Sequence, residues 1–307
     1  IISSPIAFHK QQVLTAISHH SNVLCEKPLV PILQDAMELK AALAGNNTIL
    51  GVGFQWSFSR CMRALKKDIL DGTLGRPISL KAHISWQRFD NYYSDSDWKG
   101  RIRDKNGNWV LDSILSNATA HYLHNIFYLM GSSMETAGMP QTVYGSLYRG
   151  KAIESFDTCF LRGSFAAGAV FYYVATHSGE KDTNPRFEYS FENAVVYFDQ
   201  EKDDRVYAVF RDGSEKIYGS PQTEQEEAEK INFMLDAIRK GGSSACSIET
   251  VLPHLAVCNA VFDRMNIASF PAEMHLRQEE PKGEWIRGLF DATLHCYEEM
   301  QRGVKEP

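Results

Sequence analysis

Apolar residues in the first part of the chain follow two alternating patterns. Spacings of three and four residues predict helices over residues 6–20 and 33–44. Short unbroken apolar runs predict buried strands over residues 23–25 and 48–53. Helices that alternate with short buried strands are typical of a parallel α/β sheet. We therefore expect a parallel sheet at the start of the chain.

The pattern changes after residue 53, where longer strands and fewer helices are expected. The predicted helices cover about 58–70, 113–129, 224–239 and 248–265, and the predicted strands cover about 78–86, 142–148, 156–162, 168–176, 206–211 and 215–218. Asp212-Gly213 lies between the last two strands and accepts the positive φ angles of a tight hairpin turn. We expect an α/β plus α+β fold, in which an open, mainly antiparallel β-sheet covered by helices follows the parallel sheet.

Composition excludes several classes of partner. The chain has 38 acidic and 32 basic residues, and its net charge of -6 gives no long-range attraction for nucleic acid or anionic membranes. No apolar run reaches the roughly 18 residues that a membrane helix needs. The six cysteines contain no CxxC pair, so we expect them to be reduced and not to bind zinc. These features predict a cytoplasmic protein.

A charged pair follows the first predicted strand. Glu26-Lys27-Pro28 comes directly after the apolar run over residues 23–25, at the carboxyl end of a parallel strand, where ligands bind in such sheets. A lysine held there can donate a hydrogen bond to a reacting oxygen or exchange a proton with it. A surface salt bridge in a turn explains the same residues equally well.

Asn117, His121 and His124 stand four and three residues apart, which places them on one face of the predicted helix. An imidazole can accept the proton of a hydroxyl that is being oxidised, and an amide can hold the substrate oxygen. Histidines that pack at a domain contact are the simpler explanation. A zinc site would need a third ligand, such as His83 or Asp112, and the sequence places none beside the pair, so we expect no metal.

The stretch over residues 86–109 is rich in aromatic and basic side chains. They are Trp86, Arg88, Tyr92, Tyr93, Trp98, Lys99, Arg101, Arg103 and Trp109. Aromatic faces stack on the apolar side of a sugar, and fixed donors hold its hydroxyls. An irregular loop whose aromatic side chains pack against the body of the protein is the alternative.

Three segments resemble the second half of the nucleotide-binding domain in the Gfo/Idh/MocA family of oxidoreductases, which includes glucose-fructose oxidoreductase and inositol dehydrogenase. The segments are Ser4-Pro5-Ile6-Ala7-Phe8-His9, Val23-Leu24-Cys25-Glu26-Lys27-Pro28-Leu29 and Gly51-Val52-Gly53-Phe54. The Glu-Lys-Pro run is the family's best single signature. The resemblance implies that Lys27 is the catalytic lysine.

The segment from Asn117 to His121 is similar to the family's Asp-x-x-x-His helix, which implies that His121 is an acid or base. The chain departs from that pattern twice, because Asn117 and His124 stand where the family usually has aspartates. Asparagine cannot take a proton, but it can hydrogen-bond a hydroxyl. We interpret the change as altered substrate handling, with Asn117 still at the catalytic centre.

The resemblance implies an oxidoreductase that uses NAD or NADP and moves hydride between the nicotinamide and a hydroxyl or carbonyl of a sugar, sugar derivative or cyclitol. The residues expected on the nicotinamide side are Ser4, Pro5, His9, Glu26, Lys27 and Gln55. Those expected to face the substrate are Trp109, Asn117, His121 and His124. A non-catalytic binding or scaffolding protein with the same fold is the alternative, motivated by Asn117 and by the missing glycine motif described next.

No GxGxxG run occurs in the 307 residues, so we expect the first βαβ unit of the nucleotide-binding domain to lie upstream of Ile1. Residues 1–55 are then the C-terminal part of that domain, and residues 56–307 form an α+β domain for substrate binding and oligomerisation. Residues 170–174 are apolar on both faces of a predicted strand. This pattern predicts a homodimer or homotetramer through the β-sheet.

Overall fold

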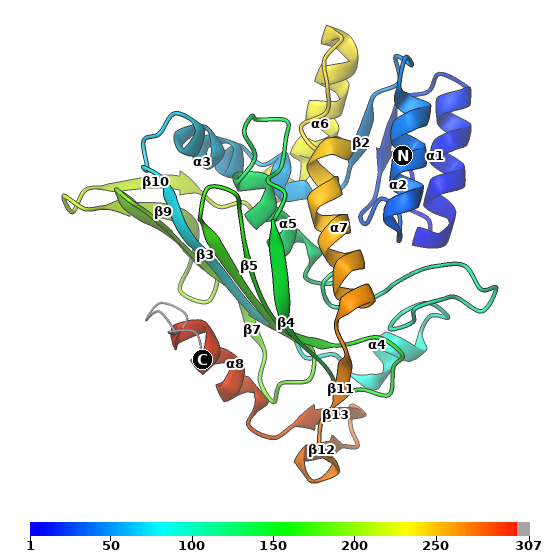
Figure 1. Cartoon of the computed structure of the whole chain (residues 1–307), viewed down its shortest axis with the longest axis vertical. Coiled ribbons are helices and arrows are strands. Elements are labelled where there is room, and N and C mark those ends of the chain that lie inside the picture. The colour runs from blue at the N-terminus through cyan, green and yellow to red at the C-terminus, as the bar shows by residue number, and fades with distance from the viewer. Residues whose placement is uncertain (300–307) are drawn as a thin grey trace.

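The computed structural model describes residues 1–299, which form a small parallel sheet and a much larger mixed sheet (Figure 1). In the small sheet, β1 (Val23–Cys25) pairs in parallel with β2 (Leu50–Val52), and Ile2 forms a parallel bridge to Cys25. All six residues of the two strands are buried, as expected when both faces of a parallel sheet are covered. The predicted parallel sheet at the start of the chain is confirmed.

The larger sheet has nine strands. They are β3 (Pro77–Ser85), β4 (Thr142–Arg149), β5 (Thr158–Ser164), β6 (Val170–Thr176), β7 (Thr183–Phe191), β8 (Ala194–Asp199), β9 (Asp203–Phe210), β10 (Glu215–Gly219) and β11 (Ile267–Ser269). Their spatial order is β10-β9-β8-β7-β3-β6-β5-β4-β11, and the neighbours are antiparallel except for β3 with β6 and β4 with β11. Gly213 turns the β9–β10 hairpin with a φ of 82°. The expected mainly antiparallel sheet is confirmed.

Helices cover the two sheets and give each a core of its own. The helices are α1 (His9–Ser18), α2 (Leu33–Leu43), α3 (Arg60–Leu70), α4 (Asp90–Ser94), α5 (Ala120–Leu129), α6 (Glu224–Lys240), α7 (Ile248–Arg264) and α8 (Leu289–Glu299). The core of the small sheet is built with α1, α2 and the first half of α7. That of the large sheet is built with α3, α5 and the second half of α7. A short ribbon, β12 (His275–Gln278) with β13 (Gly283–Ile286), precedes α8. None of the helices within residues 1–299 is long and apolar enough to cross a membrane.

Helix α7 joins the two parts of the molecule, because it packs against α2 and β2 on one side and against α5 and β4 on the other (Figure 1). Its Asn259 side chain accepts a hydrogen bond from the Leu33 N–H at 2.8 Å and donates one to the Pro31 carbonyl at 3.0 Å. Pro253 lies inside this helix without ending it. Helix α7 therefore helps to fix the small sheet to the large one.

The helix predicted over residues 113–129 begins seven residues later, at Ala120. Residues 114–119 form turns in which side chains take the place of helical backbone partners. The Ser116 hydroxyl donates to the Leu111 carbonyl at 2.8 Å, and the Thr119 hydroxyl donates to the Ile114 carbonyl at 2.6 Å. Serine and threonine compete with helix formation in this way. Asn117 therefore precedes the helix that carries His121 and His124, and the three do not share a helical face.

The second face of the large sheet is partly covered by α8 from the same chain (Figure 1). Helix α8 packs against β3 and β6, where His83 Nε2 lies 3.1 Å from the Thr293 hydroxyl and the Lys81 ammonium lies over the Tyr297 ring. Val174 on β6 is fully buried. The apolar pattern of β6 predicts a partner subunit on this face, but at Val174 the same chain covers the strand with α8.

Candidate active site

A cavity of about 180 Å³ lies at the carboxyl ends of the Ile2 segment and β1, and we call it the Lys27 cavity. One wall consists of Ser3, Ser4, Pro5, Ile6, His9, Glu26, Lys27 and Pro28, and the other of Trp98, Val110, Asp112, Ser116 and Asn117. The first wall follows from the sheet, because parallel strands deliver the residues after them to one edge. The second wall is brought there by tertiary structure.

Lys27 reaches from the first wall to the second. Its half-buried ammonium donates hydrogen bonds to the Asn117 carbonyl at 2.6 Å and to Asn117 Oδ1 at 3.2 Å. The peptide bond between Lys27 and Pro28 is cis. Burial lowers the pKa of Lys27, while the negative charges of Glu26 and Asp112 oppose the shift. The structure thus brings Lys27 and Asn117 together.

Glu26 turns away from Lys27 toward α6. Its carboxylate pairs with the Lys230 ammonium at 2.7 Å. Gly53 leaves the space for this carboxylate, because a Cβ at position 53 would lie 2.8 Å from Glu26 Oε2. Lys230 had no signal in the sequence, since it lies about 200 residues from its partner on an ordinary charged helix.

His9 ties together the loops that form the first wall. Its Nε2 lies 2.7 Å from the Ser4 carbonyl, and its Nδ1 lies 3.0 Å from the Pro28 carbonyl. Ser4 and Pro5 line the Lys27 cavity as well, and the Ser4 hydroxyl donates to Gln12. Gln55 stands in a short 3-10 helix after β2 and is not among the residues that line the cavity.

Asp112 is buried in the second wall, whereas the sequence alone indicates it only as a possible metal ligand. Its Oδ2 accepts a hydrogen bond from the Gly100 N–H at 2.5 Å. Burial raises the pKa of Asp112 to about 6, against the opposing effects of the Gly100 N–H, the Asn117 side chain and the charges of Lys27 and Lys99. The preceding Leu111 has a φ of 43°, which L residues rarely adopt and which is concentrated at functional sites.

His121 is half-buried beside Lys27 but does not line the cavity. Its Nδ1 is buried and has no hydrogen-bond partner within residues 1–299. Burial, followed by the charges of Lys27 and Lys230, lowers the pKa of His121 well below its usual value. The imidazole is therefore neutral at physiological pH.

His124, which we had expected to face the substrate, lies in the core. It is fully buried, its ring stacks on Phe54 with the centroids 4.0 Å apart, and its Nε2 lies 2.9 Å from the Ser57 hydroxyl. This placement follows from the burial of α5, in which every residue from Tyr122 to Leu129 is buried. A substrate contact at His124 does not fit this structure.

Trp109 also lies away from the Lys27 cavity. The Arg103 guanidinium covers its ring at 3.4 Å, and the indole lines a separate hollow beside α7. Trp98, from the same aromatic stretch, lines the Lys27 cavity in its place. Sequence alone does not distinguish the two tryptophans, because both stand in an irregular segment without periodicity.

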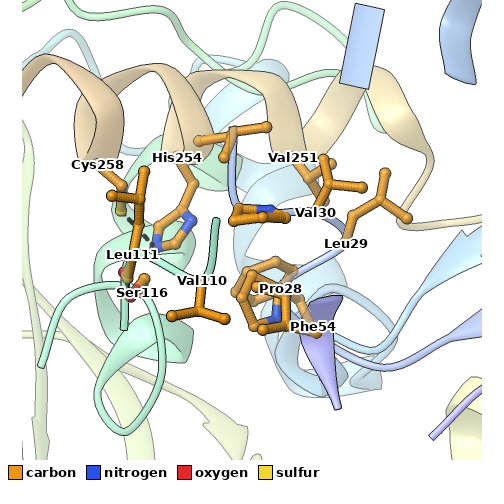
Figure 2. A pocket seen from close by; sticks show the side chains of 13 residues that line it. Pro28, Leu29, Val30, Phe54, Val110, Leu111, Ser116, Val251, His254 and Cys258 are labelled. Carbon is orange, nitrogen blue, oxygen red and sulfur yellow. Dashed lines mark hydrogen bonds between the residues drawn. The ribbon is translucent and has the colours of Figure 1, made fainter. Parts of the chain in front are cut away.

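An apolar layer backs the cavity and includes Pro28, Phe54, Val110, Val251 and His254 (Figure 2). His254 on α7 lies with Nε2 3.1 Å from the Leu115 carbonyl, and it is the donor because a carbonyl only accepts. Burial lowers the pKa of His254 to about 4, so the ring is neutral. His254 thereby holds the segment that carries Asp112 and Asn117.

A metal centre built from the two histidines has no support in the part of the chain that the structure describes. There, no group of three or more His, Cys, Asp or Glu side chains could hold a metal ion. The cysteines among these residues are unpaired.

Comparison with known proteins identifies the first part of the chain. Residues 1–54 match the model of the Gfo/Idh/MocA oxidoreductase family, described as having an NAD-binding Rossmann fold. The 2,7-anhydro-N-acetylneuraminate hydratase of Mediterraneibacter gnavus is 31% identical over 143 residues, which cover 47% of this chain and 34% of that protein. The inositol 2-dehydrogenase of Burkholderia multivorans is 36% identical over 89 residues, 28% of this chain and 26% of the relative. The aligned part thus spans about a third or less of these relatives.

The fold of most of the chain is similar to that of a solved levoglucosan dehydrogenase in complex with NADH and L-sorbose. The TM-score is 0.70 at 18% identity, and the similarity covers 85% of this chain and 76% of the other. The match at residues 1–54 contains the Glu26-Lys27-Pro28 run and the β1–β2 pair that position Lys27. Residues 1–54 therefore resemble the NAD-binding part of the Gfo/Idh/MocA oxidoreductases, and the fold of the chain is similar to that of a solved dehydrogenase.

Proposed function

We propose that this chain carries the catalytic part of an NAD-dependent oxidoreductase that acts on a hydroxyl or carbonyl of a sugar, sugar derivative or cyclitol. The single observation that carries the proposal is the Lys27 ammonium, which lies in a cavity at the carboxyl edge of the parallel sheet. The relatives named above act, by their names, on an inositol and on an anhydro sugar acid. A polyhydroxylated substrate suits the polar second wall of the cavity.

The residues present fit the nicotinamide end of the cofactor. The cavity lies where α/β sheets bind ligands, and its first wall is formed by the Ser4-Pro5 turn and the Glu26-Lys27-Pro28 segment. The unpartnered Nδ1 of His121 is a buried polar group beside it. NAD, when bound, would accept or supply the hydride. These 307 residues contain no GxGxxG run for its pyrophosphate.

We assign the proton transfer to Lys27. A lowered pKa gives the amine a larger neutral fraction, so that it can accept a hydroxyl proton during oxidation or return one to a carbonyl during reduction. Asn117 holds the ammonium with two oxygen atoms and would present its amide to a substrate hydroxyl. We assign His121, which is neutral, to a supporting role as a proton acceptor behind Lys27.

We also propose that two copies associate through the face of the large sheet that lies opposite α5. One row of paired positions crosses eight strands on that face, and we call it the open-face row: Tyr144, Arg162, Tyr172, Lys81, Glu188, Tyr197, Tyr207 and Ile217. Helix α8 covers the row at Lys81. Tyr144 and Ile217, near its two ends, are exposed. Aromatic and arginine side chains are enriched in protein interfaces.

Two further assignments belong to this proposal. The division into a nucleotide-binding part over residues 1–55 and a substrate and association part over residues 56–307 is supported by the two separate cores. A cytoplasmic location is supported by the unpaired cysteines within the described residues.

The test is a titration of NADH and NADPH, followed by nicotinamide fluorescence, against this chain and against a version that includes any residues encoded upstream of Ile1. Binding to either form supports the oxidoreductase and identifies its cofactor. If neither form binds, the function proposed here is wrong, and a non-catalytic binding or scaffolding role takes its place.

A further inference from the structure

One ionisable group of the Lys27 cavity, Asp112, has no role assigned by the family resemblance. Asp112 lines the cavity with Lys27 and is only 5% exposed. The amide of Asn117 lies between the two charges, because its Oδ1 accepts from Lys27 at 3.2 Å and its side chain also hydrogen-bonds the Asp112 carboxylate. The Lys27 ammonium and the Asp112 carboxylate are therefore both hydrogen-bonded to the side-chain amide of Asn117.

Several contacts hold Asp112 in this position. The Gly100 N–H donates to its carboxylate at 2.5 Å, and the left-handed φ of Leu111 turns the chain immediately before it. His254 donates to the Leu115 carbonyl, which fixes the segment between Asp112 and Asn117 to α7 (Figure 2 shows His254). A buried carboxylate maintained by a strained backbone is costly, and such features are concentrated at functional sites.

Two carboxylates act on Lys27, the larger effect coming from Glu26 and the smaller from Asp112. The charge of Lys27 in turn acts on His121 and His254. The charges of Lys27 and Lys99 act on Asp112, and the charge of Asp112 acts on Tyr92 and Tyr93. Glu26 is already paired with Lys230 at 2.7 Å. His121 and His254 are neutral.

We propose that Asp112 is a positioning residue that acts through Lys27, by stabilising the ammonium form in the cavity and by fixing the Asn117 amide that holds it. The inference rests on the proposed function. When the substrate hydroxyl is oxidised, its carbon loses a hydride to the nicotinamide and its oxygen loses a proton to Lys27 Nζ. The lysine gains one positive charge in a half-buried site, and the Asp112 carboxylate compensates it.

The experiment measures how readily the Lys27 amine reacts at different pH values. The protein is labelled briefly with acetic anhydride. Only the neutral amine attacks this reagent, forming the acetamide and releasing acetate, and acetylation at Lys27 is quantified by peptide mass spectrometry. Asp112→Asn removes the counter-charge, so we expect the midpoint of Lys27 labelling to fall by about one pH unit. Asp112→Glu keeps the charge and should return the midpoint toward that of the unchanged protein.

Asp157→Asn is the matched control. Asp157 is another fully buried aspartate, and it accepts backbone N–H groups from Gly150 and Lys151. The control should leave the Lys27 midpoint unchanged, which separates loss of a charge near Lys27 from a general weakening of the fold. An unchanged midpoint in Asp112→Asn, with the circular dichroism spectrum of the unchanged protein, would overturn the inference.

The unchanged protein provides a second test if Asp112→Asn does not fold. Asp112 takes up a proton near pH 6, which removes its support for the ammonium. As the pH falls through this value, the Lys27 labelling rate should therefore decrease by less than tenfold per pH unit, which is a slope below one in a plot of log rate against pH. A slope of one throughout would contradict the proposal. Labelling requires no cofactor, so the two proposals can fail separately. If the midpoint shifts but the protein does not bind NADH, only the proposed oxidoreductase is rejected. If the protein binds NADH but the midpoint does not shift, only this inference is rejected.

Discussion

The two sheets contribute to the candidate site in different ways. The small sheet delivers Lys27 from the end of a strand, so the position of the side chain follows from the backbone pairing of β1 with β2. The large sheet contributes no strand residue to the cavity, and the second wall comes instead from the loop and turns over residues 98–117. That wall is fixed by individual contacts, such as Gly100 with Asp112 and His254 with Leu115.

Because the two walls are fixed differently, substitutions in them should have different effects on activity and stability. The first wall carries the reacting group on a regular element, so removing that group should abolish chemistry while the fold survives. The second wall depends on buried polar contacts, each of which leaves an unsatisfied group when it is broken. Changes there should affect stability and proton handling together.

The largest effect is expected from Lys27→Ala. It removes the proton acceptor, and general acid–base groups contribute about 10²- to 10⁴-fold to rate. We expect turnover of a sugar or cyclitol with NAD to fall by at least about 100-fold, measured as NADH absorbance. Lys10→Ala is the control, because Lys10 is a lysine on α1 that pairs with Asp35 outside the cavity. Equal rates for Lys27→Ala and the unchanged protein would remove Lys27 from the mechanism.

The second effect concerns acid stability and tests the contact between the two parts at α7. The pKa of His254 is about 6.5 unfolded and about 4 folded, so the unfolded chain binds more protons between these values. The contribution of His254 to the free energy of unfolding should be fully present above pH 6.5. It should fall by about 3 kcal/mol as the pH drops toward 4. Urea unfolding at several pH values measures the slope.

His254→Phe is the matched variant, since it keeps an aromatic ring against Phe54 but cannot be protonated. It should flatten the pH dependence and cost about 1–3 kcal/mol at pH 7, because the buried Leu115 carbonyl loses its donor. The comparison is His83→Phe, which removes a second buried imidazole with a lowered pKa of about 3. It should also flatten the pH dependence, but through the contact with α8 instead of the junction at α7. An equally steep decline in His254→Phe would show that another group titrates.

Sequence predicted the small sheet more fully than the second wall, for physical reasons. The period of apolar residues, the strand end and Glu26-Lys27-Pro28 are local features, and the pairing of parallel strands places them without further information. The start of α5 could not be predicted from the periodicity, because the hydroxyls of Ser116 and Thr119 compete for backbone carbonyls. The burial of His124 was not predicted either, because it depends on the tertiary packing that covers α5 from Tyr122 to Leu129.

The residues that were missed have only long-range partners. Lys230 reaches Glu26 across about 200 residues, and no spacing along the chain indicates that contact. Asp112 becomes notable only because Gly100 and Asn117 surround it. Trp98 and Trp109 look alike in sequence and are separated by the packing of an irregular loop. Tertiary contacts of this kind decide the second wall.

A smaller effect is expected from Gly53→Ala, which tests how closely the first wall is fitted. The new Cβ would lie 2.8 Å from Glu26 Oε2 and displace the carboxylate from Lys230. We expect about a tenfold loss in kcat/KM, equivalent to about 1.4 kcal/mol. Gly242→Ala is the control, because nothing lies within 4 Å of a Cβ at that exposed position. Equal kinetics for the two variants would mean that the Glu26 contact does not support the site.

The smallest effect on turnover is expected from Tyr144→Asp on the open-face row. Tyr144 is 48% exposed and lies outside the Lys27 cavity, so we expect turnover to change less than about twofold, since surface changes of this kind usually cost little. A carboxylate buried between two copies without a partner would oppose association. Light scattering should therefore show the mass falling from that of an oligomer to 34.7 kDa.

Met139→Asp is the control for association, because Met139 is equally exposed at 52% but lines the hollow beside α7 and is not part of the open-face row. It should leave the oligomer intact. A monomeric mass for the unchanged protein at micromolar concentration would contradict association through the sheet. Loss of turnover in Tyr144→Asp would be more informative still, because it would mean that the Lys27 cavity depends on a neighbouring copy. Association through the large sheet would then be needed for the chemistry of the small one.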